Sequence, residues 1–595
     1  MQEIFSNTTL TINQLIEKID TGELGLPELQ RPFIWKDSKV RDLFDSLMRG
    51  YPIGYLMLWE CPTLYKKKSI GVEAHSYDSP KEVIIDGQQR LTSLYAVMKG
   101  KKVINSKFCE KTIIISYCPL QDKFEVGDQA TKKDPEWIYN ISDLFTTSNS
   151  FNFISGFIQR LGDYRVSKGE TLTDEERGNI SDHINAVLNI RGHILPVFDI
   201  KSNAEEEDVS EIFVRVNSGG VSLKQNDFIL TLLSLYWDDG RREIEQFSKE
   251  STFPTKGKTT SYNQLTTVSA QDLIRVVMAY AFDRARLKYG YKLLRGADFD
   301  RKGAVDDELR IRRFDTLKEK LPDVLDVHNW HEFIKAIMNA GYLSGDLILS
   351  GNAIFYSYAF YLIAKRRFHA SYNENMHLTS LWFFFASLTS LYTGSFESTV
   401  ENHLNSIKVL TSLNEYKDFI ISRVNERLTN DYFDITLVGS EGLAVSGRGN
   451  NAWNAYVASL NIMDAKILFS KSNLLVSKLF EPGIDGNRKS IEKHHLFPKA
   501  YLKSKGYTDS KINQMANYAF IDWKDNMNIL NDAPSVYYSI VCGGKTEEEI
   551  LRMEKENALP HGWENMAYED FLEKRRKLMA AKIKMAFEQL KKNVE

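Results

Sequence analysis

Hydrophobic residues in the first part of the chain alternate between the period of a strand and the period of a helix. A capping box at Thr11–Gln14 predicts a helix that ends near Gly22. Asp37 is expected to cap a second helix. Strands are predicted over 55–59, 83–85, 112–117 and 194–200, and helices directly after Ile85 and over 205–216. This alternation indicates one α+β domain over residues 1–235.

From about residue 226 onward, the pattern becomes helical at nearly every position. Long apolar stretches rich in aromatic residues occur at 228–237, 270–282, 353–367 and 378–392. Such stretches bury themselves against one another in helical bundles. Residues 236–432 are therefore predicted to form a helical spacer domain, and a role of this domain in gripping DNA is the alternative.

The last part of the chain, residues 433–595, combines a glycine-rich passage with further helices. A Lys- and Glu-rich amphipathic helix starts at Tyr568, and the string Ile491–Pro498 upstream of it contains two adjacent histidines. A chain of 595 residues is too long for a single hydrophobic core. The whole pattern predicts a helix-rich, multidomain α+β protein.

Composition adds little to this picture. A net charge of -3 provides no general attraction to nucleic acid, so any contact with DNA must come from local basic patches. The four cysteines have no metal-ligand spacing and are typical of free thiols in a reducing compartment. No secretory signal is visible, and the apolar stretch 378–392 is too short to span a bilayer. We therefore expect a cytoplasmic protein without a membrane partner.

The adjacent histidines are the strongest candidate for catalytic chemistry. Successive residues on a strand face opposite sides, so one imidazole can bind a metal ion while the other contacts the attacking water. We assign His494 to the metal and His495 to the general base. Asn517 would orient the base, and Asn526 would be the second metal ligand. On its own, a His-His pair is more often incidental than catalytic.

The wider string makes the assignment more specific. His494–Leu502 is followed by Ala516–Asp522 and then by Asp525–Ser535. These three segments resemble the His-Asn-His (HNH) nuclease domain at the C-terminus of GmrSD-type restriction enzymes. The resemblance implies a ββα-metal fold in residues 433–595, and the family accepts Asp or His at the position of His494. Asn528 is the alternative to Asn526 as the second metal ligand.

A second candidate site lies at the strand-to-helix turn Val83–Arg90. The free N–H groups at the start of a helix favour an anion, and Arg90 in the first turn adds positive charge. Asp86 could hold a divalent ion or polarise a water, while Gln88 and Gln89 could orient phosphate oxygens. Taken alone, the turn is only moderately specific for phosphate.

Two further strings, Leu26–Trp35 and Phe213–Gly220, accompany this turn. Together the three strings resemble the N-terminal domain of the same GmrSD-type proteins, which is related to the ParB and sulfiredoxin fold. The resemblance implies a nucleoside triphosphate site with Asp86 as a catalytic residue. The nucleotide-binding residues that it implies are Gln30, Arg31, Asp86, Gly87, Gln88, Gln89, Arg90, Phe213, Asn217, Gly219 and Gly220.

The two resemblances together imply a nucleotide-regulated, modification-dependent (type IV) DNA endonuclease of anti-phage defence. Its partners would be double-stranded phage DNA with modified cytosines and a nucleoside triphosphate (GTP, UTP or ATP), and its cofactor Mg²⁺ or another divalent cation. Cutting both strands would require a homodimer or two encounters, because each chain has one nuclease site. The alternatives are a phosphorothioate-sensing defence nuclease and a DNA-binding regulator with an inactive nuclease domain.

Overall fold

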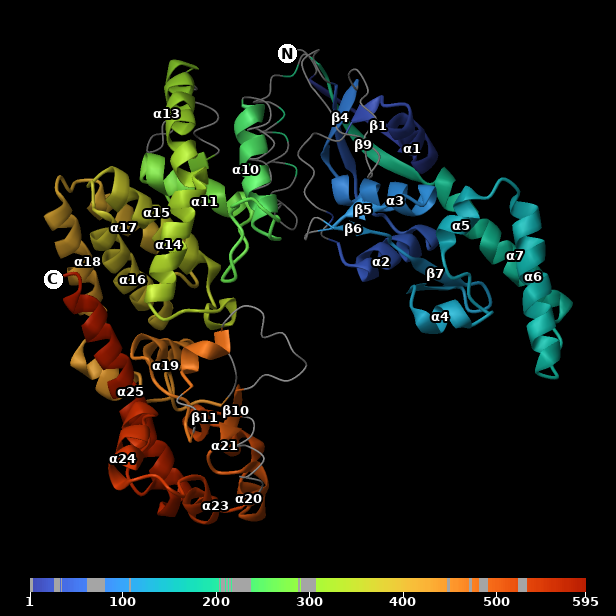
Figure 1. The fold of residues 1–595 in the computed structure, drawn as a ribbon. Coiled ribbons are helices and arrows are strands. Elements are labelled where there is room, and N and C mark those ends of the chain that lie inside the picture. Colours follow the sequence, from blue (N-terminus) through green and yellow to red (C-terminus); the bar gives the residue numbers. More distant parts are fainter. Residues whose placement is uncertain are drawn as a thin grey trace. The chain divides into compact units, whose positions relative to one another are not determined.

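The structure is a computed structural model, drawn in Figure 1. It describes residues 4–25, 33, 35–60, 81–105, 109–202, 204, 209, 212, 216, 237–286, 289–290, 307–446, 450–469, 474–480, 491–522 and 532–595. The chain divides into two compact units, Met1–Arg241 and Arg242–Glu595. The predicted spacer and nuclease segments, 236–432 and 433–595, fall almost wholly within the second of these units.

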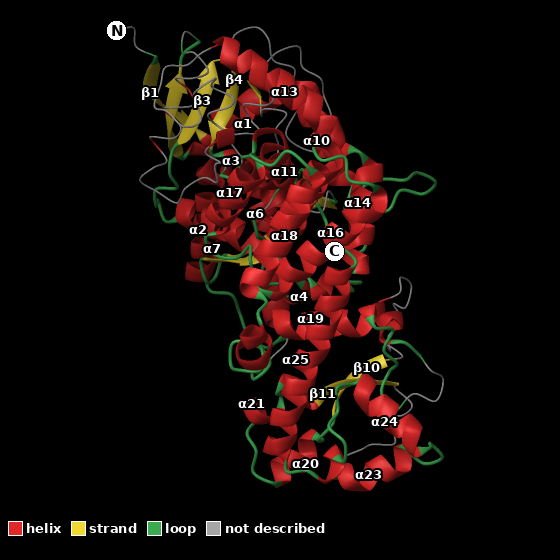
Figure 2. Ribbon diagram, turned by 90° about the vertical axis from the view of Figure 1, so that its left-hand side faces the viewer, coloured by secondary structure: helices red, strands yellow, loops and turns green. Residues whose placement is uncertain are grey.

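A mixed five-stranded sheet with the strand order β1-β9-β3-β4-β2 organises the first unit. Its strands are β1 (Phe5–Thr11), β2 (Leu24–Gly25), β3 (Leu56–Glu60), β4 (Glu82–Asp86) and β9 (Ile194–Ile200). Antiparallel pairs join β1 to β9 and β3 to β4, and parallel pairs join β9 to β3 and β4 to β2. The carboxyl end of β4 therefore lies beside the amino end of β3 (Figure 2).

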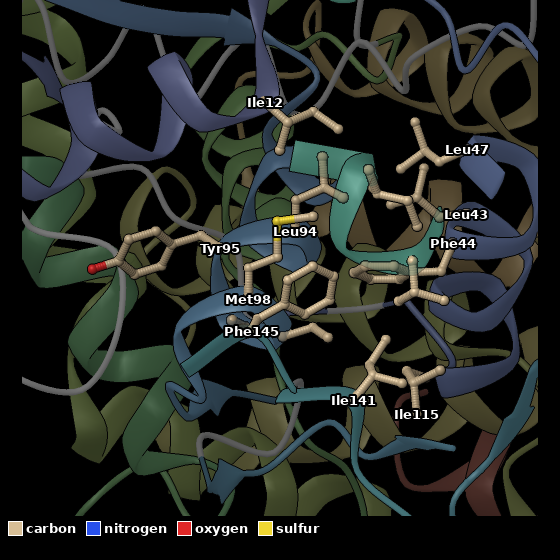
Figure 3. Close-up of a cluster of buried hydrophobic side chains, with 14 of the residues drawn as sticks. Ile12, Leu43, Phe44, Leu47, Leu94, Tyr95, Met98, Ile115, Ile141 and Phe145 are labelled. Carbon is tan, nitrogen blue, oxygen red and sulfur yellow. The ribbon is translucent and has the colours of Figure 1, made fainter. Parts of the chain in front are cut away.

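The core of this unit lies between the sheet and helices from several parts of the chain. It is formed by α1 (Ile12–Asp20), α2 (Asp37–Met48), α3 (Gln88–Lys99), α5 (Ile141–Thr146) and β7 (Ile115–Cys118). Figure 3 shows the side chains that meet there, among them Ile12, Leu43, Phe44, Leu94, Met98, Ile115, Ile141 and Phe145. Burial of such a cluster is the main favourable term for folding, and it fixes α3 and hence the turn that precedes it.

The remaining elements of the first unit extend this core, and most of them bury side chains in it. They are β5 (Val103–Ile104), β6 (Glu110–Lys111), β8 (Lys123–Val126), α4 (Gln129–Lys133), α6 (Ser150–Ser167), α7 (Asp174–Asn189) and a 3-10 turn over Ile190–Gly192. β5 pairs with β6 and β7 pairs with β8 in two small antiparallel sheets.

In the first part of the second unit, the regular elements among the described residues are all helices. Its helices are α10 (Asp238–Glu250), α11 (Ala270–Phe282), α13 (Asp307–Leu325), α14 (Val327–Asn339), α15 (Gly351–Arg366), α16 (Tyr372–Leu388), α17 (Phe396–Ile407) and α18 (Leu413–Arg427). Ala353–Ala364 of α15 are all buried, because α11 and α16 pack against that helix. This burial explains why the predicted stretch is apolar on every side.

The C-terminal part of this unit places a two-stranded sheet among short helices. Its elements are the π-turn Tyr432–Thr436, α19 (Asn451–Ile462), β10 (Ile491–His495), α20 (Lys499–Ser504), α21 (Asp509–Ile512), β11 (Tyr518–Asp522), α23 (Pro534–Val541), α24 (Glu547–Glu556) and α25 (Tyr568–Lys592). Shorter 3-10 turns cover Gly345–Leu347, Val476–Phe480, Met515–Asn517 and Trp563–Asn565. Because α25 packs against both α16 and α19, it links residues 433–595 to the helices that precede them.

The helix-rich α+β class predicted from the sequence is confirmed. The capping box at Thr11 is present, but the prediction that Asp37 caps α2 is wrong, because Lys36 holds the N-cap position and Asp37 is the first helical residue. An acidic residue in the first turn still stabilises the helix, because it lies beside the positive end of the helix dipole. The predicted helices over 205–216 and 228–237 lie almost entirely outside the described residues. Within those residues, no helix has the length and apolar character needed to cross a membrane.

Candidate functional sites

The turn between β4 and α3 depends on a glycine in the left-handed conformation. Gly87 has φ of 90° and occupies the N-cap position of α3. A Cβ built at this residue would lie 2.2 Å from Cδ2 of Leu56, a core side chain. Both the backbone angle and the space therefore require glycine. With no side chain at this position, the turn packs closely against Leu56 and Arg90.

Arg90 bridges this turn and the chain that leads into β3. Its Nη1 donates a hydrogen bond of 2.6 Å to the carbonyl of Ile53, and its Nη2 lies 3.7 Å from Oδ2 of Asp86. A Cβ at Gly54, where φ is also 90°, would stand 2.4 Å from Nη1 of Arg90. The guanidinium is thus held against Gly54 and Gly87 by the fold and carries its charge at the start of α3.

Asp86 is the titratable group of the turn. Burial raises the pKa of its carboxyl above the ordinary value of 3.8, and the Gly87 N–H and the Arg90 charge oppose this rise. Gln88 donates from Nε2 to the carbonyl of Ile84 at 3.2 Å, so its side chain stabilises the end of β4. The structure brings together the predicted residues 86 to 90. The other predicted nucleotide-binding residues, Gln30, Arg31, Phe213, Asn217, Gly219 and Gly220, lie outside the described residues.

The histidine pair ends strand β10. In the antiparallel pairing of β10 with β11, His494 lies opposite Ala519 and His495 lies opposite Tyr518. Both histidines are half-buried. Because they are neighbours on one strand, their side chains face opposite sides of the two-stranded sheet, which is the arrangement expected for one metal ligand and one base.

The His495 imidazole is held by two neighbours. Its ring centroid lies 4.4 Å from that of Tyr518, and its Nε2 lies 3.0 Å from Oδ1 of Asn513. The Tyr518 hydroxyl donates to the same Oδ1 at 3.2 Å. Burial lowers the pKa of His495 below its ordinary value, the Asn513 hydrogen bond opposes this, and the charge of Lys499 lowers it further. A neutral imidazole, which a general base requires, is therefore favoured.

Asn517 binds the backbone that follows His495 and the backbone that precedes Asn513. It is fully buried, and its Oδ1 accepts a hydrogen bond of 2.9 Å from the Phe497 N–H. Its Nδ2 donates to the carbonyls of Phe497 and Ile512 at 3.1 and 3.0 Å. Sequence reasoning expects Asn517 to orient the base. In the structure its hydrogen bonds go to the main chain near His495 and next to Asn513, and Asn513 contacts the ring.

Helices that come later in the chain fasten the same loop. The Tyr568 hydroxyl of α25 donates to the carbonyls of Lys511 and Ile512 at 2.9 and 3.2 Å. Arg575, fully buried in the same helix, donates from Nη1 to the Ala516 carbonyl at 2.8 Å. The Tyr537 hydroxyl of α23 donates to the Leu496 carbonyl at 2.5 Å. The C-terminal helix thus positions the histidine loop, beyond the solvated packing role expected from its charged sequence.

The predicted metal site is only partly covered by the described residues. His494 supplies one imidazole, whose Nε2 is buried, whereas Asn526 and its alternative Asn528 lie outside the described residues. Across the described part of the chain, no group of three or more His, Cys, Asp and Glu side chains is placed to hold a metal ion. An imidazole with an amide oxygen fits a cation that keeps several waters and phosphate oxygens as ligands.

Lysines from α20 give this region local positive charge. The ammonium groups of Lys499 and Lys503 lie 3.3 and 3.5 Å from Oδ1 of Asp509, and both side chains are about half exposed. Exposed pairs of this kind contribute little to stability, so these lysines can exchange Asp509 for a phosphate. Lys499 places positive charge near His495, where it lowers the pKa of the imidazole.

Asn513 and Tyr518 are site residues that sequence reasoning does not find. Tyr518 belongs to the string Ala516–Asp522, but nothing in that string assigns it a role. The register of β10 with β11 places it opposite His495. Asn513 follows the short helix α21 and reaches His495 only because the chain folds back across the strand end. A strand-register prediction could have found Tyr518, whereas no local pattern indicates Asn513.

Comparison with known proteins bears on the first unit. Residues 12–234 match the family model of the GmrSD restriction endonuclease N-terminal domain. The predicted resemblance is therefore confirmed for this segment, which holds the Asp86–Arg90 turn and a domain of the kind found in restriction endonucleases. The chain is also 20% identical over 581 residues to an uncharacterized protein of Methanocaldococcus jannaschii, a match that covers 93% of this chain and 91% of that protein. The HNH resemblance of the C-terminal part stays a prediction.

Proposed function

We propose that this protein is a nucleotide-regulated, modification-dependent DNA endonuclease of anti-phage defence that uses an HNH mechanism. The observation that carries the proposal is the half-buried His495, whose pKa is lowered by burial and whose loop is bonded on both sides by Asn517. The match of residues 12–234 to a restriction endonuclease domain supports DNA as the partner.

The proposed reaction is hydrolysis of a backbone phosphodiester. His495 takes a proton from water while the water oxygen forms a bond to phosphorus and the bond to the 3′ oxygen breaks. The departing 3′ oxygen takes a proton from solvent, which leaves a 5′ phosphate and a 3′ hydroxyl. A divalent cation such as Mg²⁺, held by His494 and Asn526, would stabilise the charge on the departing oxygen. Lys499 and Lys503 would contact neighbouring phosphates.

The same proposal assigns a nucleoside triphosphate to the turn before α3. At the start of α3, the positive end of the helix dipole and the charge of Arg90 favour phosphate oxygens. Asp86 would polarise the attacking water or hold a cation. Binding or hydrolysis at this turn would license cutting by the nuclease segment.

Cleavage by matched variants tests the nuclease assignment. His495→Ala is expected to abolish cutting of modified phage DNA and to leave DNA binding and nucleotide hydrolysis intact. His328→Ala removes a histidine whose side chain is 77% exposed and serves as the control. Cutting by His495→Ala at the wild-type rate would refute the assignment of the base.

Phosphate release tests the nucleotide site. Asp86→Ala and Arg90→Ala are each expected to remove nucleotide turnover, whereas Arg49→Ala, which breaks an exposed ion pair with Asp45, is expected to retain it. Turnover that survives in both variants of the turn would place the hydrolytic site elsewhere.

A further inference from the structure

Two hydrogen bonds converge on one oxygen beside the proposed base. The Oδ1 of Asn513 lies 3.0 Å from Nε2 of His495 and accepts the hydroxyl proton of Tyr518 at 3.2 Å. A carbonyl oxygen has no proton to donate. The contact with the imidazole is therefore a hydrogen bond only if Nε2 carries the hydrogen.

With Oδ1 of Asn513 facing the ring, the geometry favours one tautomer. A neutral imidazole has one N–H donor and one bare nitrogen, and the hydrogen bond of one nitrogen determines the state of the other. With the hydrogen on Nε2, the lone pair is on Nδ1. The opposite tautomer would place two lone pairs 3.0 Å apart in a half-buried site, where electrostatic repulsion is stronger than in water.

The surroundings keep the amide and the ring in this relationship. Tyr518 contacts the ring face at a centroid distance of 4.4 Å and bonds to the same amide oxygen, so it fixes both partners. The backbone next to Asn513 is fastened as well, because the Ile512 carbonyl accepts hydrogen bonds from Asn517 and from Tyr568. The asparagine is thus held by the fold.

We propose that Asn513 is a positioning residue that fixes the Nε2–H tautomer of His495 and so makes Nδ1 the nitrogen that takes the proton from water. The inference rests on the proposed nuclease function for its consequence in catalysis. Proton transfer then converts the ring to an imidazolium, whose Nε2–H still donates to Oδ1, and the bond becomes charge-assisted. No rotation of the ring is needed during the reaction.

Nitrogen NMR of the ring in the full chain tests the tautomer directly. In protein labelled with ¹⁵N at the histidine rings, the His495 signals are identified by their loss in His495→Ala. Wild type is expected to show a protonated Nε2 and a bare Nδ1 at a pH where the ring is neutral. Asn513→Leu is expected to populate both tautomers, whereas Asn513→Asp retains an oxygen acceptor and should restore the Nε2–H form. A wild-type ring protonated at Nδ1 would overturn the proposal.

Cleavage kinetics provide the second readout. Asn513→Leu is expected to lower kcat at least tenfold with little change in KM, because the tautomer and not DNA binding is altered. Gln514→Leu replaces a neighbouring exposed amide, whose Nε2 donates to the Ser510 carbonyl, and is the matched control. Equal kcat values for the two variants would overturn the role of Asn513. If the tautomer is as expected but wild-type protein cuts no DNA, the nuclease proposal fails and the assignment of the tautomer stands.

Discussion

Replacing Gly87 by alanine tests whether the phosphate turn has the geometry described. A non-glycine residue in the left-handed region costs roughly 1–2 kcal/mol. The added Cβ would also lie 2.2 Å from Cδ2 of Leu56, which is 1% exposed and so cannot swing into solvent. Overpacking of this kind costs about 1–3 kcal/mol. Gly87→Ala should therefore destabilise the first unit by about 2–5 kcal/mol.

Gly50→Ala is the matched control for this experiment. Gly50 follows α2 with φ of 71°, and a Cβ built there meets nothing within 4 Å. Gly50→Ala should therefore lose only the roughly 1–2 kcal/mol of stability that the backbone strain costs. The difference between the two variants isolates the side-chain contacts at Gly87, chiefly the one with Leu56.

Amide hydrogen exchange of peptides from residues 81–100 measures this difference in the full chain. Each 1.4 kcal/mol corresponds to about a tenfold change in the opening equilibrium. Exchange in this segment should therefore be about 5- to 150-fold faster in Gly87→Ala than in Gly50→Ala. Equal exchange rates in the two variants would refute the close approach of Leu56 to Gly87. Exchange at the wild-type rate in both variants would refute the left-handed conformation of Gly87.

Three further outcomes follow from the same structure. Asn517→Ala leaves the N–H and the carbonyl of Phe497 without their buried partner, at about 1–3 kcal/mol each, whereas the Ile512 carbonyl keeps its bond from Tyr568. Exchange over residues 495–520 should therefore rise at least tenfold, while Gln514→Ala leaves it unchanged. Asp86→Asn removes a carboxylate whose burial is costly, so urea unfolding should show a more stable first unit at pH 7. Protonation of Asp86 in the wild type relieves the same cost. The stability gain of Asp86→Asn over the wild type should therefore shrink as the pH falls through the raised pKa of Asp86 toward 3.8. A variant that is less stable than the wild type at every pH would contradict the raised pKa. Exchanging both Lys499 and Lys503 for glutamine should weaken DNA binding equally for all sequences. The slope of the logarithm of the binding constant against the logarithm of the salt concentration should become smaller by about 1 per lysine. An unchanged slope would exclude phosphate contacts by these residues.

Local signals in the sequence predicted the elements around the first site well. The capping box at Thr11 predicted the start of α1, and the alternating apolar residues of β9 predicted that strand from Ile194 to Ile200. β1 was missed because most of its residues are polar, and only its pairing with β9 makes it a strand. The glycine at the end of β4 also indicated the turn correctly.

Contacts between residues far apart in the chain could not be predicted in the same way. Arg90 was expected to face a phosphate, and its hydrogen bond to the Ile53 carbonyl depends on the pairing of β3 with β4. The histidine loop depends on Tyr568 and Arg575, which belong to a helix whose sequence reads as an ordinary solvated face. Asn513 reaches His495 through the fold alone. Periodicity predicts which face of a helix or strand is buried, but it does not identify the residues from other parts of the chain that contact that face.

The most direct test of the account is cleavage of phage-sized DNA with Mg²⁺ by the wild-type chain and by His495→Ala. The substrates are unmodified DNA, glucosylated-hydroxymethylcytosine DNA and phosphorothioated DNA, each with and without GTP, UTP or ATP. The proposed function predicts that the wild-type chain cuts the DNA with modified cytosines, that nucleotide changes the rate of cutting, and that His495→Ala does not cut. Equal cutting of all three substrates, cutting of the phosphorothioated DNA alone, or no cutting under any condition would contradict it.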